Sequence, residues 1–176
     1  MNLNNEILLW LQQLRNPVLN EVMLAVTNLV WLIPAAAAVG LCFKKTRKKA
    51  LIMLISIAAA LLAANLIKTV VHEPRPFTQI AGLTRIGPMP GGSSFPSAHT
   101  ACAFTLFWTL CFLKTKRGRI LSLVLACLIA FSRMYLGVHY PLDVIGGILV
   151  SCITSWIVVR LYEYVKERRR SHASKV

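Results

Sequence analysis

Five long runs of apolar residues constrain the fold of this chain more than any other feature of its sequence. They cover residues 22–43, 50–71, 97–113, 120–136 and 142–161. A helix of about 17–25 apolar residues matches the thickness of the hydrocarbon core of a bilayer. Hydrophobic residues make up 56% of the chain, a share that is rare in soluble domains of this size. The sequence therefore predicts an all-α, polytopic membrane helix bundle with five to six transmembrane helices.

The first 20 residues have a different pattern from the apolar runs. Leu3, Ile7 and Leu11 would share one face of a helix, while asparagine and glutamine residues lie elsewhere on it. The segment is too short and too polar to span a bilayer, and Asn16-Pro17 would end the helix. We therefore expect residues 1–20 to form an interfacial helix. A deeper insertion of this helix would raise the number of spans from five to six.

The basic residues orient the predicted spans. Fifteen of the 20 lysines and arginines lie in three clusters, at residues 44–49, 114–119 and 160–175. The clusters follow the first, third and fifth apolar runs, so they lie on one side of the membrane, which the positive-inside rule makes the cytoplasmic side. Residues 164–176 are then a basic cytoplasmic tail. Because the clusters border the membrane, they indicate topology in the plasma membrane and exclude a nucleic-acid partner.

A second group of ionisable residues lies near the opposite, extracytoplasmic side. Such residues at membrane depth are costly and are candidates for function. The alternative, that each one only extends its polar end to the interface, explains a single residue but not their gathering at one face. The group comprises Lys68, His72, Arg75, Arg85, His99, Arg133, His139 and Asp143.

Part of this group has the chemistry of an anion site. Lys68, Arg75 and Arg133 carry positive charges, and the arginine fork suits phosphate oxygens. Pro96 is expected at the first position of a helix, where free backbone N–H groups bind anions. The hydroxyl of Ser97 and the backbone near Ala98 would face the same anion.

The histidines complete a candidate reaction centre. His139 and Asp143 are four residues apart, so the carboxylate could hold one ring nitrogen and leave the other free as a nucleophile. His99 could donate a proton to the leaving oxygen. The five cysteines lie in apolar runs without the spacing of metal ligands. We expect phosphoryl transfer that needs neither a metal nor another cofactor.

Three motifs in this order resemble the signature of the type-2 phosphatidic acid phosphatase superfamily. They are Lys68-x6-Arg75-Pro76, Pro96-Ser97-Ala98-His99 and Ser132-Arg133-x5-His139-x3-Asp143. The resemblance covers roughly residues 50–160, which would be the phosphatase core of a single membrane domain made by residues 1–176.

The resemblance implies a role for each matching residue. His139 would form a phosphohistidine, Asp143 would orient it, and His99 would protonate the leaving group. Lys68, Arg75, Ser97, the Ala98 backbone and Arg133 would bind the phosphate. The family usually has glycine at the position of Ala98. Alanine keeps the backbone N–H and adds one methyl group, so we expect the site to tolerate it. No metal is needed in this family.

The expected substrate is a lipid phosphate or diphosphate in the outer leaflet of the cell envelope. Undecaprenyl diphosphate is favoured, and phosphatidylglycerophosphate, phosphatidic acid and a lipid A-type phosphate are alternatives. A non-catalytic membrane scaffold or transporter subunit is a rival of a different class, but it does not explain two histidines and an aspartate beside an anion site. The sequence leaves open the oligomeric state and the roles of His72, Glu73 and Arg85.

Overall fold

Helices form most of the computed structural model, which describes residues 3–173. No strand occurs in this part of the chain, so the predicted all-α class is confirmed. In chain order the helices are α1 (Leu3–Gln13), α2 (Pro17–Asn28), the 3₁₀ helix η1 (Leu29–Trp31), α3 (Leu32–Gly40), α4 (Arg47–Val71), α5 (Pro76–Gln79), α6 (Ala98–Phe112), α7 (Arg119–Tyr135) and α8 (Pro141–Ala173).

Local sequence signals set several of the helix ends. Asn16 caps α2, because its side-chain oxygen accepts a hydrogen bond from the backbone N–H of Leu19 at 2.9 Å. Pro17 and Pro141 are the first residues of α2 and α8, a position where the missing N–H is not needed. At the other end of α4, His72 adopts a left-handed backbone conformation with φ of 50°. The chain then leaves the helix axis toward the long loop before α6.

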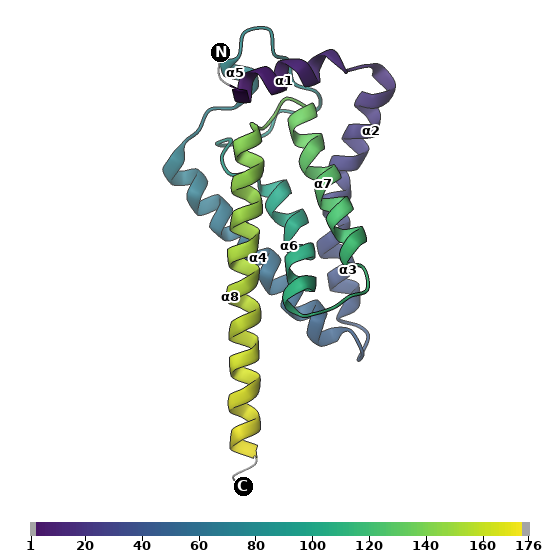
Figure 1. Cartoon of the computed structure of the whole chain (residues 1–176), viewed down its shortest axis with the longest axis vertical. Helices are drawn as coiled ribbons and strands as arrows, with labels where there is room; N and C mark the ends of the chain where they lie inside the picture. The colour runs from purple at the N-terminus through teal and green to yellow at the C-terminus, as the bar shows by residue number, and fades with distance from the viewer. Residues whose placement is uncertain (1–2, 174–176) are drawn as a thin grey trace.

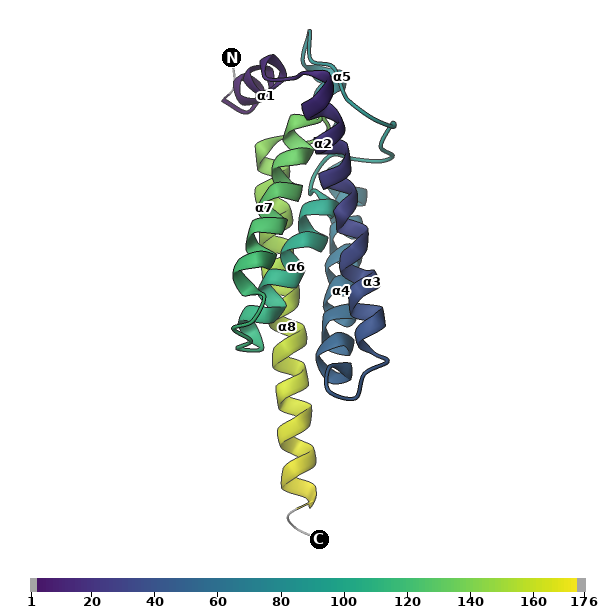
Figure 2. The same ribbon diagram turned by 90° about the vertical axis from the view of Figure 1, so that its right-hand side faces the viewer.

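The central element of the bundle is α6, which packs against α4, α7 and α8 (Figure 1). The run α2–η1–α3 lies along the outside, where α2 contacts α7 and α3 contacts α4 (Figure 2). Across one end of the bundle lies α1, close to α5 and the loops (Figure 1). At the opposite end the long helix α8 projects beyond the other helices (Figure 1).

The interior combines apolar side chains with small hydroxyl residues. The largest buried cluster joins α6 to its neighbours through residues such as Ile57, Phe104 and Ile129. Ser56 and Thr105 are fully buried, and each hydroxyl donates to a carbonyl oxygen of its own helix. Small residues at helix interfaces allow backbones to approach closely, which is the usual way in which helices pack within membranes.

The helix α8 passes very near the start of α6. A Cβ atom built on Gly147 would lie 2.7 Å from the carbonyl oxygen of Ser97, and one on Gly146 would lie 2.4 Å from the ring of Phe95. Both distances are shorter than side-chain contacts allow. Glycine at these two positions therefore lets the segment before α6 rest directly on α8, which places both helix starts in one layer.

The observed helices agree with the apolar runs but differ at their ends. Three stretches are long and apolar enough to cross a membrane, namely Pro17–Gly40, Arg47–Gln79 and Pro141–Ala173. The helices α6 and α7, with 15 and 17 residues, are shorter. The count of five to six spans thus stays a prediction. The helix α8 extends beyond the apolar run that ends at residue 161 and continues to Ala173, so it includes most of the basic tail; Lys175 of the tail lies outside the described residues.

The N-terminal helix is anchored to the loop at the same end of the bundle. Leu8 and Leu11 of α1 are buried against Ile80 and Leu83. The side-chain amide of Gln12 donates to the carbonyl oxygen of Gly82 at 2.8 Å. These contacts show what α1 packs against within the protein, while its predicted position at the membrane interface stays a prediction.

Candidate active site

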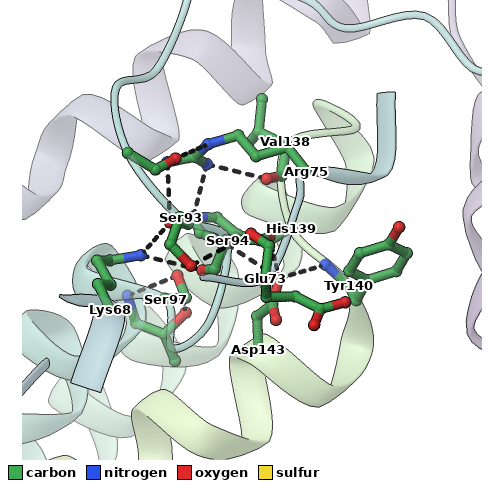
Figure 3. Close-up of polar contacts among 12 residues, drawn as sticks. Lys68, Glu73, Arg75, Ser93, Ser94, Ser97, Val138, His139, Tyr140 and Asp143 are labelled. Carbon is green, nitrogen blue, oxygen red and sulfur yellow. Dashed lines mark hydrogen bonds and ion pairs between the residues drawn. The ribbon is translucent and has the colours of Figure 1, made fainter. Parts of the chain in front are cut away.

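The strongest polar cluster of the site is the pair His139 and Asp143. His139 lies in the loop between α7 and α8, and Asp143 lies in the first turn of α8. The Nδ1 atom of His139 is 3.2 Å from Oδ2 of Asp143. The same oxygen accepts the backbone N–H of Tyr140 at 2.8 Å and the hydroxyl of Ser94 (Figure 3). The carboxylate is 1% exposed, so this hydrogen bonding compensates for its burial.

The environment of His139 keeps its imidazole neutral. Burial lowers the pKa of His139 to about 4, and the positive charges of Arg133 and Arg75 act in the same direction. The hydrogen bond to Asp143 opposes this shift. Since a neutral ring carries one proton, a proton on Nδ1 toward Asp143 leaves a lone pair on Nε2. The Nε2 atom lies 3.4 Å from a terminal nitrogen of Arg75.

Arg75 connects the long loop to the loop that carries His139. Its guanidinium donates to the carbonyl oxygens of Gly91 at 2.8 Å, Gly92 at 3.1 Å and Val138 at 3.0 Å (Figure 3). These three bonds come from three different nitrogens, and the side chain is buried. Arg75 therefore ties the long loop, at residues 91 and 92, to the residue before His139. Its guanidinium lies beside the position where a phosphate would meet Nε2.

Lys68 supports the same loop from the end of α4. Its Nζ atom donates to the carbonyl oxygens of Ser93 at 2.5 Å and Ser94 at 3.0 Å. An ammonium group has three donors, so one remains for another acceptor. Lys68 and Arg75 thus turn four consecutive backbone carbonyls, from residue 91 to residue 94, toward positive charge (Figure 3).

Arg133 and His99 lie on the other side of the site. A terminal nitrogen of Arg133 donates to the hydroxyl of Thr27 at 2.8 Å, whereas its Nε has no hydrogen-bond partner among residues 3–173. The Arg133 side chain is only 7% exposed. His99 is in the first turn of α6, and the edge of the Trp31 ring packs against it with centroids 6.1 Å apart. A buried guanidinium with an unused donor is suited to binding an anion.

One cavity of about 690 Å³ connects these groups. Its lining includes most of the residues predicted for the site, namely Lys68, Arg75, Ala98, His99, Arg133 and His139. A smaller, largely apolar cavity of about 280 Å³ between α2 and α7 shares Pro90, His99 and Arg133 with it. The site thus places a region rich in positive charge next to a region lined by apolar side chains.

Two predicted site residues, Asp143 and Ser97, do not line this cavity. Asp143 lies behind His139, and Ser97 has a structural role. Its hydroxyl caps α6 and accepts from the hydroxyl of Thr100 at 3.0 Å, and its backbone N–H donates to the carbonyl oxygen of Asp143. The expectation that Pro96 opens the helix is wrong, since Ser97 is the cap and α6 begins at Ala98. The reason is that the serine side chain satisfies the free N–H groups of the first turn.

Three residues of the site were not singled out by the sequence analysis. Ser94 is fully buried and bonds to Asp143, and its hydroxyl lies 3.4 Å from Nδ1 of His139. Thr27 and Trp31 come from the N-terminal helices and contact Arg133 and His99. The one available signal was Thr27-Asn28, a polar pair within an apolar run.

Two residues whose roles were left open are now distinguished by position. His72 lines the cavity of about 690 Å³. Arg85 lies elsewhere, because its guanidinium bonds to the carbonyl oxygen of Gly87 and stacks over the ring of Phe77 at 5.8 Å.

Comparisons with known proteins agree with the motifs. The sequence profile of the PAP2 superfamily matches residues 49–167. An undecaprenyl-diphosphatase from Sulfolobus acidocaldarius is 36% identical over 75% of this chain, although the match spans only 63% of that relative's own length. Undecaprenyl-diphosphatase BcrC from Bacillus subtilis is 33% identical over 86% of this chain and 79% of its own. The crystal structure of LpxE from Aquifex aeolicus superposes with a TM-score of 0.80 at 26% identity, covering 91% of this chain and 96% of that one.

Proposed function

Because the chain belongs to the PAP2 superfamily, we propose that this membrane phosphatase hydrolyses a lipid diphosphate, with undecaprenyl diphosphate favoured. The observation that carries the proposal is the pair His139–Asp143, whose histidine lines a cavity together with the cationic side chains of Lys68, Arg75 and Arg133. A nucleophile, an orienting carboxylate and an anion site are the parts that phosphoryl transfer requires.

The first half of the reaction forms a covalent intermediate. The lone pair on Nε2 of His139 attacks the terminal phosphorus, and the bond from that phosphorus to the bridging oxygen breaks. The electron pair of the broken bond goes to the leaving lipid phosphate, which His99 protonates. His139 then carries the phosphoryl group, and Asp143 stabilises the positive charge on the imidazole through Nδ1.

The second half releases inorganic phosphate. A water molecule gives a proton to His99 and attacks the phosphorus, and the bond from phosphorus to Nε2 breaks. The imidazole recovers its lone pair, and His99 recovers its proton. Lys68, Arg75 and Arg133 balance the negative charge of the phosphoryl oxygens in both halves, the role that metal ions have in other phosphatases.

The apolar cavity beside the cationic one supports a lipid substrate. The two cavities meet at His99, where the leaving group would lie. Apolar residues such as Leu24, Ile86 and Met89 line the smaller cavity and could contact the first carbons of an isoprenoid chain. Two relatives are named undecaprenyl-diphosphatases, which supports the diphosphate over the monophosphate.

A substrate panel tests the proposal. Purified protein in detergent should release phosphate fastest from undecaprenyl diphosphate, with undecaprenyl phosphate, phosphatidylglycerophosphate and phosphatidic acid assayed in parallel. Activity should persist in EDTA, because the cationic side chains supply the charge. A higher kcat/KM for phosphatidylglycerophosphate or phosphatidic acid would replace the favoured substrate by that alternative, and a strict need for a divalent ion would contradict the mechanism.

We further propose that the site faces the extracytoplasmic side of the plasma membrane. The site lies at the end of the bundle opposite the loops at residues 41–46 and 113–118 and the C-terminus of α8 (Figure 1). These regions carry the three basic clusters, which remain preferentially in the cytoplasm.

Cysteine labelling in intact cells tests this orientation. In a background without the five native cysteines, Met89→Cys should react with a membrane-impermeant maleimide, since Met89 is exposed in the loop before α6. Lys48→Cys should react only after permeabilisation. The reverse pattern would place the site in the cytoplasm.

A further inference from the structure

A groove far from the site separates α4 from the projecting part of α8. It has a volume of about 850 Å³, larger than the cavity that contains His139. Its walls are apolar, with Leu51 and Ile55 on α4 facing Leu161 and Val165 on α8. These four side chains are 47–58% exposed, so nothing within residues 3–173 covers them.

One end of the groove is basic. Lys48 from α4 and Lys166, Arg169 and Arg170 from α8 line it, and no acidic residue is among the lining residues. Arg169 and Arg170 lie three and four positions after Lys166, so both are neighbours of Lys166 on one face of the helix. The acidic Glu163 instead pairs with Arg160 at 3.6 Å, outside the groove.

The order of these residues along both helices matches the order of groups in a phospholipid. The two helices run in opposite directions, so Lys48 near the start of α4 and Lys166 near the end of α8 meet at the same end. From these residues, Leu51 and Ile55 lie toward the bundle on α4, and Leu161 does so on α8. A lipid would place its phosphate among the basic groups and its acyl chains along the apolar walls.

The depth of the basic end also fits a headgroup. At about 1.5 Å per residue, roughly 37 Å of helix separate Pro141 from Lys166. The hydrocarbon core of a bilayer is about 30 Å thick, and about 40–45 Å with its headgroups. With Pro141 near one interface, the ammonium group of Lys166 therefore reaches the phosphates of the opposite leaflet.

We propose that this groove between α4 and α8 binds an anionic phospholipid of the leaflet opposite the active site. A second copy of the chain is a poor occupant, because each copy has a net charge of +14 and only six acidic residues to set against its 20 basic ones. A neutral or zwitterionic lipid fits the walls but leaves four cations uncompensated. The proposed lipid site lies at the end of the bundle opposite the active site and does not depend on which substrate the enzyme hydrolyses.

Native mass spectrometry of the full chain in detergent tests the site. Phosphatidylglycerol should remain bound as one adduct under activation that removes phosphatidylcholine with the same acyl chains. The triple variant Lys48→Gln, Arg169→Gln, Arg170→Gln should weaken phosphatidylglycerol binding at least about tenfold, since each basic residue near an anionic headgroup contributes roughly fivefold.

A matched triple variant separates a defined site from general attraction. Lys44→Gln, Lys45→Gln, Lys116→Gln removes the same charge from the same end of the protein outside the groove, and it should bind phosphatidylglycerol as the wild type does. Ile55→Trp fills the groove without changing any charge and should displace the lipid. This variant tests the proposal independently if the groove triple variant does not fold. Equal loss in both triple variants, equal retention of phosphatidylcholine, or unchanged binding by Ile55→Trp would each overturn the proposal.

Discussion

Asp143 joins three parts of the site through a single carboxylate oxygen. One oxygen of its carboxylate interacts with the His139 ring, the Tyr140 backbone and the Ser94 hydroxyl. This set of donors fixes the carboxylate from three directions, and the carboxylate in turn selects the ring nitrogen that carries the proton. Its position in the first turn of α8 makes the helix the support for His139, the nucleophile that we propose.

Asp143→Asn should lower kcat about 10²–10⁴-fold, because an amide can donate to Nδ1 and so favours the wrong imidazole tautomer. The measurement is kcat for the lipid diphosphate, with thermal unfolding to confirm a folded protein. Glu73→Gln is the control, since Glu73 lies in the loop between α4 and α5 and contributes its backbone carbonyl, which the substitution keeps, to the hydrogen bonds of the site. The kcat of this variant should stay near that of the wild type. A kcat within threefold of the wild type for Asp143→Asn would remove Asp143 from the mechanism.

The buried position of His139 predicts the acidic limb of the pH profile. The nucleophile is the neutral ring, and burial lowers its pKa to about 4 from the ordinary value near 6.5. Lowering the pH to 5.5 should therefore leave His139 neutral, and activity should be lost only as the pH falls through about 4. The test is to measure kcat/KM against pH for two lipids whose phosphates have different pKa values. If the loss of activity at low pH reflects ionisation of the substrate, its midpoint differs between the two lipids; if it reflects His139, the midpoint is the same. An enzyme limb near 6.5 would contradict the burial.

At the scale of elements, the N-terminal helices complete the site. Residues 49–167 match the family profile, yet Thr27 and Trp31 lie before this region and contact Arg133 and His99. The run α2–η1–α3 therefore does more than cover the bundle, since it lines the smaller cavity and contacts Arg133 and His99 of the cationic cavity.

Thr27→Val should raise KM for the lipid diphosphate several-fold with a smaller effect on kcat, because Arg133 loses the acceptor that fixes its guanidinium. Loss of this buried hydrogen bond should also lower the free energy of unfolding by about 1–3 kcal/mol. Thr27→Ser keeps the hydroxyl and should restore KM. If Thr27→Ser and Thr27→Val raised KM equally, the hydrogen bond would not be the cause.

The contact between α6 and α8 gives a second prediction at this scale. Gly147→Ala should reduce activity at least about tenfold, since the added methyl group would meet the backbone of Ser97 at 2.7 Å and displace the start of α6 with His99. Leu149→Ala on the exposed face of α8 is the control and should change activity little. Activity and melting temperature measured on both variants check this, and a fully active Gly147→Ala would show that the contact can relax.

Much of this arrangement follows from sequence, for identifiable physical reasons. Apolar runs predict the helices, because a chain that crosses lipid must satisfy its backbone hydrogen bonds within itself. The spacing of His139 and Asp143 around Pro141 predicts their contact, because both residues lie at the start of the same helix. The contact between Ser94 and Asp143 joins residues 49 positions apart, and that between Thr27 and Arg133 joins residues 106 apart. Such pairs depend on the tertiary packing. The extension of α8 was missed because hydropathy does not detect charged residues with high helix propensity.

The whole molecule is electrostatically polarised along its length. At the site end Arg75 and Arg133 are buried and Lys68 is half-buried, and each donates hydrogen bonds within the protein. The cations at the other end are mostly exposed on loops and on α8. The cations at the site end suit a substrate phosphate that binds and is released. The exposed cations at the opposite end suit the phosphate headgroups of membrane lipids. Under the proposed function and orientation, a chain with a net charge of +14 would use its positive charge both to bind phosphate and to orient itself in the membrane.

Covalent transfer of the terminal phosphate to His139 is tested most directly by trapping the intermediate in the intact protein. The enzyme would be mixed with undecaprenyl diphosphate labelled with ³²P in the terminal phosphate, quenched in alkali, digested and analysed by mass spectrometry. We predict an acid-labile phosphate on His139 in the wild type, more of it in His99→Ala if water activation slows, and none in folded His139→Ala. Label on another residue, or turnover by His139→Ala near the wild-type rate, would contradict the mechanism.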